Sequence, residues 1–181
     1  MRAWVFAILF MCSSWTVVWA GDFDITGVGL RAGMNIKDAG LPPTEKEDFQ
    51  QYDAYAIMQL PWIFSESPIP NLTWQLMGSA GALRGDDETA FISTLTTGFA
   101  YHNPEWRILL DMGLGVAGVS RHQFGRQDIG GPFQFIAHGG GGFEIFKKTI
   151  LGYRFHHMSD ATIFGSSRGV DLHMIDLRYL F

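Results

Sequence analysis

Apolar residues alternate with small or polar residues along most of the chain after residue 20. In residues 27–34, for example, the even positions are apolar and the odd positions are glycine or arginine. A period of two is typical of a β-strand with one face in an apolar environment, because successive side chains point to opposite faces. Segments of this kind occupy residues 27–34, 51–60, 72–79, 91–99, 107–116, 133–144, 151–156 and 175–181. The pattern therefore predicts an all-β protein with eight strands.

Eight antiparallel strands of roughly 10 to 14 residues are long enough to cross a bilayer at a tilt, and an even number closes without a free edge. We therefore predict an eight-stranded antiparallel transmembrane β-barrel whose apolar residues face lipid. A soluble β-sandwich or lipocalin-like barrel, with its apolar residues turned inward, is the alternative. The predicted lumen is too narrow for a channel. Its polar residues are expected to be Arg31, Asp53, Arg107, Asp111, Glu144, Arg154, Asp176 and Arg178.

The connections between these segments differ in length, which predicts an orientation. Residues 37–50, 121–131 and 160–168 form long connections, whereas 102–105 and 146–148 are short. Bacterial barrels have short periplasmic turns and longer outer loops. Residues 157–171 are therefore expected at the outer leaflet.

The N-terminal segment and the composition support an exported barrel. Residues 1–20 combine one arginine, an apolar run and a Val-x-Ala ending, which predicts a signal peptide followed by a barrel over 21–181. Cys12 is the single cysteine and lies inside this segment, so no disulfide is expected. The 22 glycines and 14% aromatic residues suit a β-rich protein, and a net charge of −5 with no basic run disfavours nucleic acid as a partner.

The stretch GYRFHHMSDA at residues 152–161 carries the candidate chemistry. His157 and Ser159 are two residues apart, so a strand places them on one face. If the last two strands pair His157 with Asp171, the same register pairs Phe155 with His173 and matches apolar residues beyond them. A serine hydroxyl becomes a nucleophile when a histidine, oriented by a carboxylate, accepts its proton.

Two other interpretations of this segment remain open. Its polar residues are equally typical of a hairpin end at a membrane interface, with no chemistry. Alternatively, His157, His173 and Asp171 are candidate metal ligands, although they show no familiar ligand spacing.

The segment GYRFHHMSDA, followed by GVDLHMIDLRYLF, resembles the PagL-like lipid A 3-O-deacylases of the outer membrane. That family carries a His-x-Ser-Asn-Ala segment on the penultimate strand and an acidic residue on the last. The resemblance implies a serine esterase with Ser159 as nucleophile, His157 as base and Asp171 as the orienting acid. It also implies lipid A of lipopolysaccharide as substrate, a site at the outer leaflet of a Gram-negative outer membrane, and no cofactor or metal. A homodimer stays open.

The chain departs from the family pattern at two positions. Asp160 stands where the family has asparagine, and Asp171 is shorter than the usual glutamate. The oxyanion-hole candidates are therefore Asp160, which donates a hydrogen bond only when protonated, and the backbone at Thr162. A catalytically weak or inactive structural or adhesive barrel is the alternative function, and a soluble secreted lipid-binding barrel is a third.

Gly139–Gly142 form a run of four glycines in the sixth segment. The run predicts either a close approach of neighbouring strands or a groove for acyl chains.

Overall fold

The computed structural model describes residues 24–37, 39–41, 45–61, 69–165 and 169–181. The predicted signal peptide, residues 1–20, lies outside the described residues. The described residues contain no helix long and apolar enough to cross a membrane. The strands are β1 (Ile25–Met34), β2 (Phe49–Leu60), β3 (Leu72–Gly85), β4 (Glu88–Asn103), β5 (Ile108–Val119), β6 (Gln123–Phe124), β7 (Gln127–Asp128), β8 (Phe133–Phe146), β9 (Thr149–Ser159) and β10 (Val170–Leu180).

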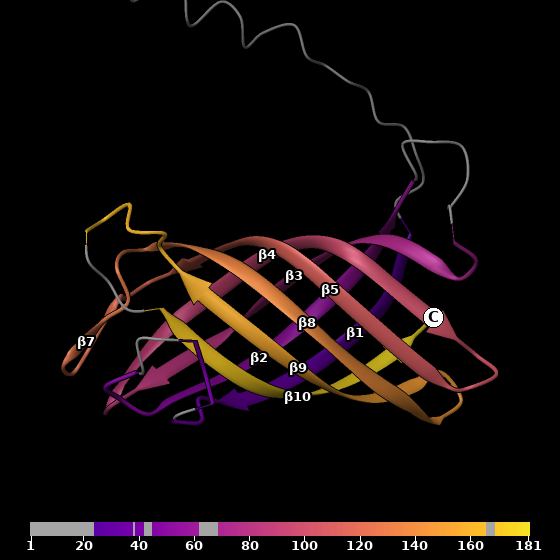
Figure 1. Ribbon diagram of the computed structural model, residues 1–181, viewed down its shortest axis with the longest axis horizontal. Helices are drawn as coiled ribbons and strands as arrows, with labels where there is room; N and C mark the ends of the chain where they lie inside the picture. Colours follow the sequence, from indigo (N-terminus) through magenta and orange to yellow (C-terminus); the bar gives the residue numbers. More distant parts are fainter. Residues whose placement is uncertain (1–23, 38, 42–44, 62–68, 166–168) are drawn as a thin grey trace, which may run out of the picture.

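Eight of these strands form a closed barrel in the order β1-β10-β9-β8-β5-β4-β3-β2 (Figure 1). Every neighbouring pair is antiparallel, and β1 pairs with β10 to close the sheet. The apolar residues of the period-two pattern point outward, as shown by Leu30, Leu114 and Ile175, which are 62%, 66% and 57% exposed. The predicted transmembrane barrel is confirmed. The soluble alternative is wrong, because it requires these side chains to point inward.

The long connections gather at one end of the barrel, which we call the loop end. The β6–β7 hairpin and the segment after β9 lie at this end, opposite the C-terminus (Figure 1). The sequence pattern did not predict the hairpin, because each of its strands has only two residues.

The barrel interior has an apolar layer near the loop end. Phe124 and Ile129, from the connection between β5 and β8, are fully buried there against strand residues. This layer differs from the wholly polar lumen that the sequence predicted. The other members are Phe49, Leu83, Ala90, Ile92, Ala117, Val119, Ile136, Met158, Val170, Leu172 and Met174.

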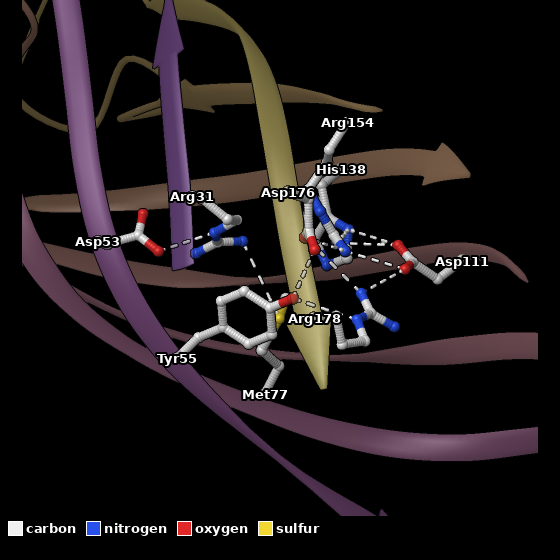
Figure 2. Close-up of polar contacts among 9 residues, drawn as sticks. All are labelled: Arg31, Asp53, Tyr55, Met77, Asp111, His138, Arg154, Asp176 and Arg178. Carbon is white, nitrogen blue, oxygen red and sulfur yellow. Dashed lines mark hydrogen bonds and ion pairs between the residues drawn. The ribbon is translucent and has the colours of Figure 1, made fainter. Parts of the chain in front are cut away.

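A second layer of the interior is a network of paired charges (Figure 2). Arg154 and Arg178 both donate to Asp111 Oδ2, at 2.9 and 2.8 Å. Arg31 Nε donates to Asp53 Oδ1 at 2.8 Å. Each of these side chains was predicted to face the lumen, and each is buried.

The lumen prediction was wrong for Arg107. This residue lies between β4 and β5 with a positive φ of 56°, and its side chain is exposed. The in–out alternation of side chains holds only within a strand. Arg107 lies in a turn, so its odd residue number does not determine which face its side chain occupies.

Candidate active site on the outer wall

His157 and Asp171 face each other across β9 and β10. The register pairs His157 with Asp171, Phe155 with His173 and Tyr153 with Ile175, which is the predicted register. His157 Nδ1 lies 2.5 Å from Asp171 Oδ1. Since an ionised carboxylate only accepts hydrogen bonds, we assign the proton to Nδ1, which leaves Nε2 as a free base.

The two members of this pair differ in exposure. The Asp171 side chain is 4% exposed, whereas the His157 side chain is 29% exposed. The acid is therefore shielded while the imidazole reaches the outer wall. This combination suits a base that meets a substrate from outside the barrel.

Ser159 is the last residue of β9 and has the same parity as His157. Both side chains border Gly169. A Cβ built on Gly169 would lie 3.3 Å from His157 Cε1 and 3.3 Å from Ser159 Cβ. The serine hydroxyl makes no hydrogen bond with any residue that the structure describes. It is free to turn, and catalytic hydrogen bonds often tighten only when substrate binds.

Two contacts from the β1–β2 connection hold Asp171 on its other sides. The Leu41 N–H donates to Asp171 Oδ2, and the Asp171 N–H donates to Glu45 Oε1 at 2.8 Å. Sequence reasoning missed both residues. They lie 130 and 126 positions away in the chain and show no motif, so no sequence signal could have identified them.

Asp160 and Thr162, the two oxyanion-hole candidates, are hydrogen-bonded within the turn that follows β9. Asp160 is 1% exposed, and its Oδ1 and Oδ2 accept the N–H groups of Thr162 and Phe164 at 3.0 and 3.1 Å. In this arrangement the carboxylate is an acceptor and the Thr162 N–H is already engaged. The reason is local, because an aspartate at the end of a strand readily caps the turn that follows it.

An apolar groove of about 870 Å³ begins at His157 and crosses the outer wall. Paired residues of successive strands form one of its sides, from Phe155 through Gly139, Met112 and Phe99 to Trp74. Gly139 leaves open space there, since the one neighbour of an added Cβ would be the Asp111 carbonyl oxygen at 4.0 Å. Gly140 and Gly142 instead lie close to β9, where an added Cβ would meet the Tyr153 and Leu151 carbonyls. The glycine run thus combines a close approach of neighbouring strands with open space in the groove; that the groove holds acyl chains stays a prediction.

The metal interpretation has no support in the geometry of His173. Its Nδ1 lies 2.5 Å from the Tyr153 hydroxyl rather than sharing a ligand position with His157. Within the described ranges, no group of three or more His, Cys, Asp or Glu residues could hold a metal ion.

Comparisons with known proteins identify the family. A family model described as "Lipid A 3-O-deacylase (PagL)" matches residues 50–180. The chain is 32% identical over 75 residues to the lipid A deacylase PagL of Bordetella bronchiseptica, a match that spans 41% of this chain and 42% of that protein. The crystal structure of the outer membrane enzyme PagL superposes with a TM-score of 0.65 at 18% identity, over 85% of this chain and 99% of that one, which supports the fold. Since the family model covers seven of the eight barrel strands, the chain belongs to the lipid A 3-O-deacylase (PagL) family.

Proposed function

We propose that the protein is an outer-membrane serine esterase that removes the ester-linked 3-O acyl chain from lipid A. The observation that carries the proposal is the His157–Asp171 pair, which lies beside Ser159 at the mouth of an apolar groove on the outer wall. Membership of the lipid A 3-O-deacylase family supports the same substrate and bond.

In the proposed reaction, His157 Nε2 accepts the Ser159 proton as the Oγ attacks the ester carbonyl. The tetrahedral intermediate then collapses, the bond to the sugar oxygen breaks, and the imidazolium returns its proton to that oxygen. A water molecule, deprotonated by His157, next attacks the acyl-serine ester and releases a fatty acid and free Ser159. Asp171 holds the Nδ1–H and stabilises the imidazolium in both halves.

The oxyanion needs a donor other than the side chain of ionised Asp160. Among the described residues, the Ala161 N–H has no hydrogen-bond acceptor, and it follows Ser159 by two positions. We assign this N–H as one donor. Ala161 lies in the turn just after β9, outside the strand ladder, with a positive φ of 50°.

The proposed setting is the outer leaflet. The site lies at the loop end of the barrel, where the long connections gather, as in bacterial barrels whose long loops are extracellular. Lipid A occupies that leaflet, so its acyl chain would enter the groove laterally without leaving the membrane.

The decisive test is Ser159→Ala in cells that make lipid A. We expect the unmutated protein to release the 3-O acyl chain, and the variant to lose at least about 10³-fold of the rate, because the nucleophile is gone. Mass spectrometry of lipid A provides the measurement. Ser93→Ala, on the exposed face of β4, is the matched control. An unmutated protein that leaves lipid A intact, or a Ser159→Ala variant as active as the control, would overturn the proposal.

A further inference from the structure

We infer that the connection between β1 and β2 positions the acid of the active site, with Glu45 as a positioning residue. The inference rests on the proposed esterase function. It concerns Gly40, Leu41 and Glu45, which contact Asp171, and Lys46, which is linked to the β9–β10 hairpin through Gln127.

The first observation is that three hydrogen bonds hold Asp171 in position. Its Oδ1 meets His157, its Oδ2 accepts the Leu41 N–H, and its own N–H donates to Glu45. Glu45 is 7% exposed and Asp171 is 3% exposed, so water does not compete effectively for these bonds. The carboxylate orientation is therefore determined by the β1–β2 connection as much as by the histidine.

The second observation is the position of Asp171 within its strand. It is the second residue of β10, and a single paired position, Val170 with Met158, lies beyond it. Strand ends open more easily than strand centres, because few backbone bonds hold them. The Glu45 bond to the Asp171 N–H supplies an anchor at this weak point.

The third observation is a second link from the same connection to the site. Gln127 is fully buried; its Oε1 accepts the Lys46 N–H at 2.6 Å, and its Nε2 donates to the Gly169 carbonyl at 3.1 Å. Gly169 is the residue that borders both His157 and Ser159. Thus Glu45 bonds directly to Asp171, and its neighbour Lys46 is linked to Gly169 through the Gln127 side chain.

The fourth observation is the fit at Gly40. A Cβ at this position would lie 2.6 Å from Asp171 Oδ2 and 3.0 Å from Asp171 Cβ. The backbone of the connection therefore packs directly on the acid. Any side chain at residue 40 would push the carboxylate away from its place against His157.

These contacts predict how Glu45 variants behave. Glu45→Ala removes the acceptor of the Asp171 N–H, so we expect kcat to fall roughly 10- to 100-fold as the acid shifts, with a smaller change in KM. Glu45→Gln keeps a side-chain oxygen in place and should restore most of kcat. Gly40→Ala should also lower kcat, because its added methyl group would displace the Asp171 carboxylate.

Glu47→Ala is the matched control, because this glutamate lies in the same connection but accepts from Arg126 rather than from the hairpin. These hydrogen bonds from Arg126 also lower the pKa of Glu47. Heat-modifiable electrophoretic mobility shows whether each variant forms a barrel.

A readout that does not need turnover is the ¹⁵N-histidine NMR signal of the His157 Nδ1–H. A short bond to a carboxylate places this proton far downfield. We expect Glu45→Ala to shift it upfield or broaden it, whereas Glu45→Gln and Glu47→Ala leave it in place.

The possible failures are distinguishable. If the unmutated protein releases no acyl chain, the proposed function fails, and the NMR comparison still decides whether Glu45 positions the acid. If a folded Glu45→Ala variant matches the Glu47→Ala control in both kcat and the Nδ1–H signal, the inference is overturned. Equal losses in the Ala and Gln variants would also overturn it, because the charge rather than the hydrogen bond would then be responsible.

Discussion

At the scale of single residues, the turn after Ser159 contains unusual backbone conformations. Ala161 and Thr162 have φ values of 50° and 63°, a region that non-glycine residues occupy at a cost. Thr162 is β-branched, which increases the cost. The Asp160 carboxylate holds the turn through its bonds to the Thr162 and Phe164 amides. Strained backbone of this kind is common at functional sites, where the surrounding structure imposes it.

Thr162→Gly is expected to stabilise the protein. Glycine removes the steric cost of the positive φ, and this gain exceeds the entropy that glycine adds to the unfolded chain. The free energy of unfolding should rise by about 0.5–1 kcal/mol. Urea titration of the barrel in lipid vesicles measures the change. A decrease in the unfolding midpoint would show that Thr162 makes stabilising contacts that outweigh the strain.

Asp160→Asn is expected to weaken the turn without raising activity. An asparagine side chain has one oxygen, so it can serve only one of the two amides that Asp160 now accepts. The loss should be about 1–3 kcal/mol of stability. The same lipid A assay measures activity. A gain in acyl release would instead favour a weak natural enzyme that lacks an amide donor at this position.

At the scale of elements, β8 shapes the groove because its outward row contains small residues. Ala137 pairs with His157, and Gly139 pairs with Phe155. The neighbouring strand β5 presents Met112 and Leu114, which are 64% and 66% exposed. The apolar groove therefore runs past large side chains, and the missing side chain of Gly139 leaves it open beside Phe155.

Gly139→Leu tests whether the groove holds the acyl chain. A leucine would occupy the open space next to Phe155, so we expect kcat/KM for long-chain esters to fall about tenfold or more, with less effect on short-chain esters. Gly118→Leu is the control, since Gly118 is also exposed on the wall but does not line the groove. Equal activity of the two variants on long chains would place the substrate elsewhere.

At the scale of the whole molecule, the closed sheet and its charged interior determine stability. Asp111 lies between two arginines from β9 and β10 and is itself on β5, so one carboxylate links distant parts of the barrel (Figure 2). Tyr55 from β2 extends the network by donating to Asp176 at 2.6 Å. Removal of one partner leaves buried charge uncompensated, which costs more than the pair contributes.

Asp111→Asn is therefore expected to lower the free energy of unfolding by about 3–5 kcal/mol. The His157–Asp171 pair lies on the outer wall, so residual activity per folded molecule should stay near the unmutated value. Folding into lipid vesicles and the specific activity of the folded fraction provide the two measurements. A loss of specific activity without loss of stability would mean that the network communicates with the site.

The sequence by itself determined the number of barrel strands, the outward-facing apolar rows and the pairing of His157 with Asp171. These features depend on the period-two alternation and on a hairpin register that matches apolar residues, and both are local in the chain. The role of Ser159 stays a prediction. Only the tertiary structure decided that Leu41 and Glu45 hold Asp171, that Phe124 and Ile129 fill the barrel mouth, and that Asp160 is occupied by its own turn. Such contacts arise when loops distant in sequence pack together after the barrel closes, and no alternation within a strand encodes them.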